Sequence, residues 1–223
     1  MKRKEELVTG EIYHVFNKSI AGFKIFNSDG EFIRILRIIR YYQIETLPIK
    51  FSQFIKLNKI KRDNFNKYFN SILTNKEKRI QIIAYCIMPT HFHLILKQLK
   101  ENGISIFMGN ILNSYSHYFN IKHKRKGPLW EGRFKNVLVK SDEQLIHLTR
   151  YIHLNPTSSG IVNKPEDWCY SSYMEYIAKD KIKEIICNYS DIIQISKDSY
   201  KQFVEDRVSY QRELYKIKHL ILE

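Results

Sequence analysis

The pattern of hydrophobic and polar positions predicts strands and helices that follow one another along the chain. Short stretches rich in β-branched and aromatic residues predict strands at about 11–17, 79–88, 91–96 and 134–139. Apolar residues three and four positions apart predict helices at about 28–42, 103–123 and 141–155. Pro89-Thr90 predicts a tight hairpin, and Pro156 is expected to end the third helix. This order predicts an α+β fold with helices on one or both sides of a sheet.

Two segments lie outside this framework. The stretch from about 45 to 79 is dense in Lys and Asn, and it is expected to be an insertion with one amphipathic helix carrying Phe65, Tyr68, Phe69 and Ile72. After residue 156 we expect a loop, an aromatic cluster and a helical tail that runs to Glu223. The cluster comprises Trp168, Tyr170, Tyr173 and Tyr176.

Charge points to a polyanionic partner. The 223 residues include 37 Lys and Arg against 23 Asp and Glu, a formal net charge of +14, which favours nucleic-acid binding. No run approaches the ~18 apolar residues of a membrane span, and the polar amino terminus does not resemble a signal peptide. The three cysteines fit neither a disulfide framework nor a zinc knuckle. We therefore expect a cytoplasmic protein that binds no membrane.

The sequence His91-Phe92-His93 is the sharpest chemical feature. Residues two apart on a strand project from the same face, so both imidazoles point one way and Phe92 points into the core. Two nitrogen donors in one direction form half of a divalent metal site. The alternative is a pair of partly exposed strand histidines without a ligand.

The predicted helix 141–155 carries a second set of polar residues beside its buried stripe. Tyr151 and Asn155 lie one turn apart and can face the same ligand. A tyrosine near a cation can attack phosphorus as a phenoxide, although most tyrosines of this kind are interfacial aromatics with a hydrated hydroxyl. The stripe comprises Gln144, His147, Tyr151 and Asn155, and the buried one Leu145, Leu148 and Ile152.

Residues 122–140 interleave cations with aromatic side chains. Cations for phosphates and flat side chains for bases suit a groove for single-stranded nucleic acid, while the alternative is a solvated basic loop. The candidate DNA-binding residues are Lys122, Lys124, Arg125, Lys126, Trp130, Arg133 and Lys135.

An ordered series of motifs over residues 10–177 resembles the single-tyrosine HUH transposases, which comprise insertion-sequence transposases and REP-associated tyrosine transposases. The series comprises YHVFN at 13–17, AYCIMPTHFHLIL at 84–96, GPLWEGRFK at 127–135, YIHLNP at 151–156 and DWCYSSY at 167–173. The resemblance implies a central antiparallel sheet with helices packed on it, a ferredoxin-like or RRM-like nuclease core over residues 1–178. Residues 179–223 would then be a helical extension.

The resemblance also implies site residues. His91 and His93 correspond to the ligands of a divalent ion, Mg²⁺ or Mn²⁺, and Tyr151 corresponds to the nucleophile. Asn155 corresponds to the polar residue that completes the metal site, with His147 and His153 as substitutes.

The activity implied is cleavage and rejoining of single-stranded DNA near hairpins, through a 5′-phosphotyrosine link and a free 3′-hydroxyl. That activity would place the protein at the nucleoid. A non-catalytic protein that binds palindromic or hairpin DNA is the main alternative, and a barrel metallohydrolase is disfavoured because the chain is shorter than the ~250 residues usual for that fold. The sequence leaves open whether one chain completes the site or a homodimer shares it.

Overall fold

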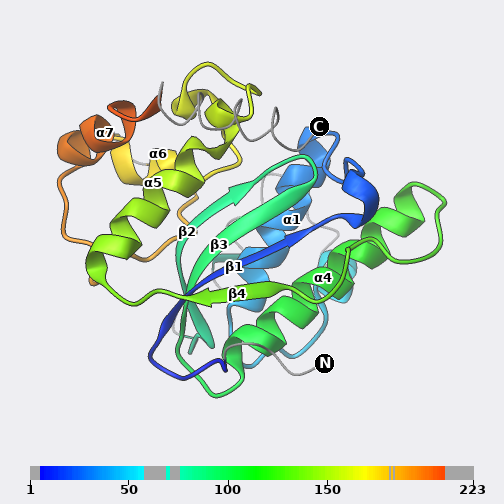
Figure 1. The fold of residues 1–223 in the computed structure, drawn as a ribbon. Helices are drawn as coiled ribbons and strands as arrows, with labels where there is room; N and C mark the ends of the chain where they lie inside the picture. Colours follow the sequence, from blue (N-terminus) through cyan, green and yellow to red (C-terminus); the bar gives the residue numbers. More distant parts are fainter. Residues whose placement is uncertain (1–5, 58–68, 71–75, 181, 183, 209–223) are drawn as a thin grey trace.

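The structure, a computed structural model, describes residues 6–57, 69–70, 76–180, 182 and 184–208. Four strands form one antiparallel sheet in the order β2-β3-β1-β4 (Figure 1). They are β1 (Ile12–Lys18), β2 (Ile80–Ile87), β3 (His91–Gln98) and β4 (Lys135–Leu138). The four predicted strands and the predicted α+β class with its central antiparallel sheet are confirmed.

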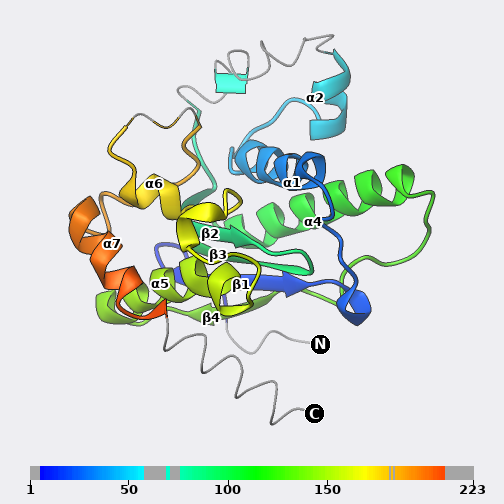
Figure 2. The ribbon, with the colours of Figure 1, turned by 90° about the horizontal axis from the view of Figure 1, so that it is seen from above.

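Helices cover both faces of this sheet (Figure 2). On one face lie α1 (Asp29–Tyr42) and α4 (Gly103–Lys122), with α2 (Phe51–Leu57) beyond α1. On the other face lies α5 (Asp142–Ser158), with α6 (Tyr173–Ile177) and α7 (Lys197–Glu205) next to it. Two single-turn 3₁₀ helices, η1 (Ile20–Gly22) and η2 (Pro165–Asp167), complete the described elements.

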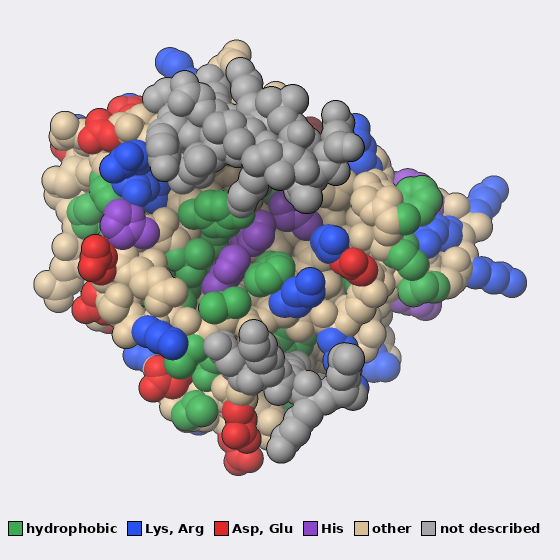
Figure 3. All heavy atoms as spheres, viewed as in Figure 1, with side chains coloured by type: hydrophobic (Ala, Val, Ile, Leu, Met, Phe, Trp, Pro, Cys, Tyr) green, Lys and Arg blue, Asp and Glu red, His purple; other side chains and the backbone are tan. Residues whose placement is uncertain are grey.

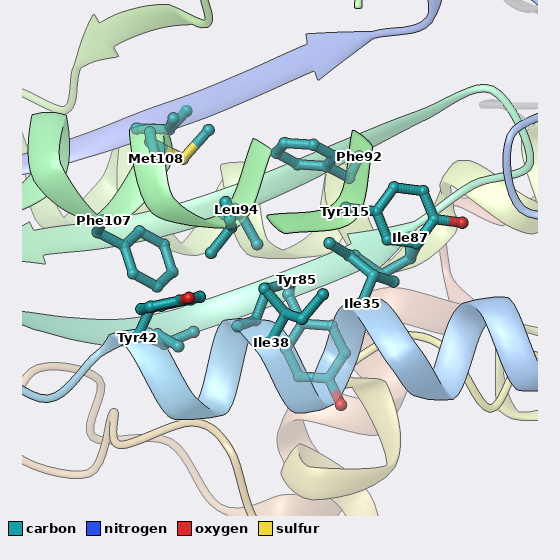
Figure 4. Packing of buried hydrophobic residues seen from close by; sticks show 14 of the residues in the cluster. Ile35, Ile38, Tyr42, Tyr85, Ile87, Phe92, Leu94, Phe107, Met108 and Tyr115 are labelled. Atoms are coloured by element: carbon teal, nitrogen blue, oxygen red, sulfur yellow. The ribbon is translucent and has the colours of Figure 1, made fainter. Parts of the chain in front are cut away.

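The main core lies between the sheet and the pair α1 and α4. Alternate residues of β3 point to this side, so Phe92 and Leu94 are fully buried there, as predicted for Phe92. Figure 4 shows them facing Ile35 of α1 and Phe107 and Tyr115 of α4. The apolar side chains that recur every second residue on the strands therefore pack against those that recur every 3.6 residues on the helices, and together they form one apolar layer.

The edge strand β2 is buried along its whole length. The backbone of residues 170–172 and of Asn188 hydrogen-bonds to its outer edge, which protects an edge that would otherwise be open to another chain. This contact divides the aromatic cluster. Trp168 and Tyr170 pack against Phe32 on one side of the sheet, whereas Tyr173 and Tyr176 fill the smaller core under α5.

The Lys- and Asn-rich insertion packs against α1 through aromatic side chains. Phe51, Phe54 and Phe69 surround Tyr41, with ring centres 5.1–6.1 Å apart. Helix α2 precedes the helix that we expected. Of the expected helix only Phe69 is described, and residues 69–70 are helical, whereas Phe65, Tyr68 and Ile72 lie outside the described residues.

Helix α5 begins as predicted and ends later. The Ser141 hydroxyl accepts the backbone N–H of Gln144 at 3.1 Å, which caps the first turn, while the Gln144 carboxamide accepts the N–H of Lys140 at 2.7 Å. The prediction that Pro156 ends the helix is wrong, because α5 continues to Ser158. Pro156 lacks one N–H donor, but Pro156 and Thr157 are buried, and their packing offsets the lost hydrogen bond.

The expected helical tail is only partly helical in the described residues. Residues 184–196 run without a helix, α7 follows, and residues 209–223 lie outside the description. None of the helices described has both the length and the apolar composition needed to cross a membrane.

Candidate active site

Strand register brings the chemical side chains to the sheet face that α5 partly covers. His93 lies directly opposite Phe16 on β1, and Phe16 lies opposite Lys135 on β4. His91 lies opposite Lys18 in the same way. Because directly opposed residues of antiparallel strands share a face, these five side chains form two neighbouring rows on one surface.

Each of the two histidines has its Nδ1 atom engaged by a neighbour. Nδ1 of His93 lies 2.9 Å from Nε2 of His14, and Nδ1 of His91 lies 2.9 Å from the Thr90 hydroxyl. With Nδ1 of each ring in these contacts, a ligand would bind His91 and His93 through their Nε2 atoms. The ring centres of His91 and His93 are 5.1 Å apart.

Burial keeps the imidazoles of this site neutral. It lowers the pKa of His93 well below its ordinary value and that of His14 to about 4. Burial also lowers the pKa of His91, against a hydrogen bond to Asn155 that raises it, and the nearby charge of Lys18 adds to the lowering. Neutral imidazoles at pH 7 keep the lone pairs that a cation requires.

Tyr151 approaches this pair from α5. Its ring centre lies 5.9 Å from that of His93, edge to face, and its side chain is 41% exposed. Partial burial raises the pKa of its hydroxyl, so the group is protonated at neutral pH. One turn later, Asn155 hydrogen-bonds to His91. The predicted site residues on the strand and on the helix therefore meet.

Neither substitute histidine reaches the pair. His153 is fully buried on the other side of α5, with its ring nitrogens 2.7 Å from the Tyr200 hydroxyl and 2.8 Å from the Ser172 hydroxyl. His147 is exposed and contacts Arg150 at 2.7 Å and the ring of Phe203. The expectation that either could replace Asn155 is wrong, because both side chains face α7 or the small core.

The two imidazoles and the Asn155 amide fit a small cation whose remaining coordination positions are filled by water or phosphate. A ring separation of 5.1 Å suits two imidazoles that share one ion at about 2 Å from each nitrogen. Among the described residues, no three His, Cys, Asp or Glu side chains gather as a metal site. His91, His93 and the amide oxygen of Asn155 would therefore leave positions for water or a phosphate oxygen.

A hollow of about 440 Å³ lies beside the two histidines. Figure 3 shows histidine side chains in a row at the centre of this face, with apolar and cationic side chains next to them. The hollow is lined by Phe16, Asn17, Lys18, His91, Phe92, His93, Glu131, Gly132, Arg133 and Lys135. Its cations lie on the side away from α5.

The predicted DNA-binding residues are divided between two places. Arg133 and Lys135 line the hollow, whereas Lys124, Arg125 and Lys126 line a shallow depression at the carboxyl end of α4. Lys122 donates to the buried carboxylate of Glu31 at 2.7 Å. The sequence thus predicted one basic segment, and the structure presents two basic surfaces.

Trp130 belongs to the core. Its side chain is 9% exposed, its ring packs against Phe92 and Tyr115, and its indole N–H donates to the Ser116 hydroxyl at 2.9 Å. We therefore correct the expectation that this ring stacks on a base, because no face of it is available. Trp130 is buried by contacts with distant segments, which the pattern of cations and aromatic residues at 122–140 could not indicate.

Sequence reasoning missed His14 as a site residue. It lies 79 positions from its partner His93, and the only local signal was its place two residues before Phe16 on the same strand face. The pairing register of β1 and β3 brings His14 into contact with His93.

Comparison with known proteins agrees with this architecture. A family model described as IS200-like transposase matches residues 49–155. A Haemophilus influenzae protein named as a candidate REP-associated tyrosine transposase is 30% identical over 104 residues, 42% of this chain and 58% of that protein. The REP-associated tyrosine transposase of Escherichia coli K12 is 23% identical over 109 residues, 48% of this chain and 63% of that protein.

The chain thus matches less than two thirds of the length of both relatives. A solved structure of a REP-associated tyrosine transposase bound to a REP hairpin superposes with a TM-score of 0.51 at 16% identity, over 87% of this chain and 98% of that one. This likeness extends the shared fold beyond the matched segment. Over residues 49–155 the chain is similar to the IS200-like transposase family.

Proposed function

We propose that this protein cleaves and rejoins single-stranded DNA next to hairpins, with Tyr151 as the nucleophile. The observation that carries the proposal is the placement of the Tyr151 ring 5.9 Å from the ring of His93, although the two belong to elements far apart in the sequence. The match of residues 49–155 to the IS200-like transposase model supports the same chemistry, because transposases cut and join DNA. The basic hollow beside the histidines supplies a surface for a phosphodiester.

The proposed step is a transesterification that conserves the number of phosphodiester bonds. The Tyr151 oxygen loses its proton and attacks the phosphorus, while the bond from phosphorus to the 3′ oxygen of the preceding nucleotide breaks. That oxygen takes up a proton, which leaves a 5′-phosphotyrosine and a free 3′-hydroxyl. Attack by a 3′-hydroxyl reverses the link, so strands are exchanged without ATP.

A divalent cation, Mg²⁺ or Mn²⁺, is part of the proposal. His91, His93 and Asn155 would hold it, and the bound ion would supply positive charge that polarises the scissile phosphate. Two imidazoles and one amide form a donor set without a carboxylate, which favours Mn²⁺ over the harder Mg²⁺. The raised pKa of Tyr151 makes such positive charge necessary, because the phenol does not ionise by itself at neutral pH.

Binding of DNA hairpins is the second part of the proposal. One structural relative is described as bound to a REP hairpin, and the net charge of +14 of this chain suits a DNA partner. The cations at the end of α4, which are Lys124, Arg125 and Lys126, lie away from the histidines and offer phosphate contacts outside the cleavage site.

Covalent capture tests the proposal directly. The protein is incubated with Mn²⁺ and a pool of labelled hairpin oligonucleotides that carry randomised single-stranded flanks. We expect a denaturation-resistant protein–DNA adduct in the wild type and in Tyr118→Phe, a partly buried tyrosine on the opposite sheet face, and none in Tyr151→Phe. Sequencing the captured strands maps the cleaved junction.

A matched binding measurement separates the enzyme from a DNA-binding protein without chemistry. His91→Ala should abolish the adduct while hairpin affinity changes little, because phosphate contacts elsewhere carry most of the affinity. Tight hairpin binding by the wild type without any adduct would refute the catalytic proposal and leave the binding protein.

A further inference from the structure

The hollow beside His91 and His93 has an aromatic floor that the proposed chemistry does not use. Phe16 occupies the position between His93 and Lys135 in the cross-strand row, and its ring lies 4.9 Å from that of His14 and 5.8 Å from that of His93. The side chain is only partly buried and lines the hollow. An aromatic ring in this setting offers a flat apolar surface next to the reacting centre.

Cations surround this floor on the side away from α5. Lys18, Arg133 and Lys135 line the hollow together with one carboxylate, Glu131. Lys18 and Glu131 form an ion pair of 3.0 Å in which both side chains are more than half exposed, so a phosphate can replace the carboxylate at low cost. The volume of about 440 Å³ lies within the usual range for small-ligand sites.

An aromatic floor with a cationic rim is the chemistry of a single-stranded nucleotide site. Bases stack on aromatic side chains whatever their identity, and Lys and Arg bind the backbone phosphates. A hydrophobic ligand would not need the rim, and a small anion would not need the ring. The nucleic-acid ligand is therefore the class that uses both features.

We propose that this hollow binds the nucleotide on the 5′ side of the scissile phosphate, with its base stacked on Phe16. The assignment of this nucleotide to the 5′ side of the phosphate rests on the proposed function. In-line displacement places the attacking and the leaving oxygens on opposite sides of phosphorus. Tyr151 comes from α5, which packs on the β2 side of the histidines, and the hollow lies on the side of β1 and β4. The nucleotide that keeps the leaving 3′ oxygen therefore occupies the hollow.

A binding cycle without chemistry tests the stacking. Affinities for a labelled dT5 oligonucleotide and for the same backbone without bases are measured by fluorescence anisotropy at low salt, with EDTA present. We expect Phe16→Ala to weaken dT5 binding about 5- to 150-fold, the range for one stacked base, and to leave binding of the base-free backbone unchanged. Phe16→Tyr keeps the ring and should bind dT5 as the wild type does.

Phe23→Ala is the matched control, since that ring is 62% exposed and does not line the hollow. Equal dT5 affinity in the wild type and in Phe16→Ala would overturn the inference. Equal weakening for both ligands would also overturn it, because the ring would then support the fold and not a base. Thermal unfolding of each variant accompanies these measurements.

Polarity is tested on the DNA junction mapped by covalent capture. A single abasic nucleotide is placed immediately 5′ or 3′ of the cleaved bond. The 5′ abasic site should slow adduct formation by the wild type and add nothing further to Phe16→Ala, whereas the 3′ abasic site should affect both proteins equally. The reverse pattern would refute the assigned side. If no DNA forms an adduct, the proposed function fails, but the dT5 cycle still decides whether the hollow binds a nucleotide.

Discussion

Replacing His14 by alanine tests how the proposed cation site is held. Nε2 of His14 lies 2.9 Å from Nδ1 of His93, and the two rings stack with their centres 5.1 Å apart. His93 is 8% exposed, so water cannot fully replace the lost partner. The substitution removes the contact that fixes which His93 nitrogen carries the proton and how the ring is turned.

The magnitude follows from two general effects. A buried polar group left without its hydrogen bond costs about 1–3 kcal/mol, so the free energy of unfolding should fall by at least that order. Loss of the residue that orients a metal-binding histidine costs roughly 10- to 100-fold in metal affinity, about 1.4–2.7 kcal/mol. We expect His14→Ala to bind Mn²⁺ more weakly by this factor.

The assay is a titration of free Mn²⁺ followed by electron paramagnetic resonance, without DNA. His14→Gln, which restores an acceptor, should recover part of the affinity, and His117→Ala removes an exposed histidine of α4 as a control. If His14→Ala binds Mn²⁺ like the wild type while His93→Ala does not, the bond between the rings has no role in positioning the ligand.

Three further predictions concern stability and DNA binding. Burial would raise the pKa of Glu31, but hydrogen bonds, of which that from Lys122 has the largest effect, lower it. Glu31→Gln should therefore reduce the free energy of unfolding in urea by about 1.5–3 kcal/mol, and an unchanged midpoint would contradict this. Burial lowers the pKa of His153 to about 3, so the unfolded chain alone binds a proton below about pH 6.5. The free energy of unfolding should be constant above that pH and fall by up to about 1.4 kcal/mol per pH unit as the pH drops toward 3. His153→Gln should make this decline less steep, and an equally steep decline in the variant would contradict the prediction. Trp130→Phe should lower stability by about 1–3 kcal/mol without weakening oligonucleotide binding by the folded protein, whereas Lys135→Ala should weaken binding; a loss of affinity in Trp130→Phe at equal folded fraction would restore its predicted DNA role.

Much of the site was visible in local spacing. The period of two on a strand placed His91 and His93 on one face and Phe92 in the core, and the helical period placed Tyr151 and Asn155 one turn apart. Ser141 and Gln144 marked the start of α5. These predictions succeeded because each depends on the backbone conformation of one short segment.

Other features depended on contacts between distant segments. The pattern at 122–140 suggested that Trp130 was a DNA contact, and packing against β3 and α4 made it a core residue. Pro156 marked a helix end by local rules, and burial kept the helix intact for two more residues. The resemblance left His153 as a substitute for Asn155, but its side chain faces the small core and not the strand histidines.

The sequence by itself determined which side chains share a face of each strand and helix, since that follows from the geometry of the local backbone. Only the tertiary structure decided which faces meet. Strand register put His14 against His93 and Phe16 between His93 and Lys135, and the packing of α5 on β2 brought Tyr151 over the same surface. The physical reason is that register and packing are fixed by burial of the whole core, which no short window of sequence contains.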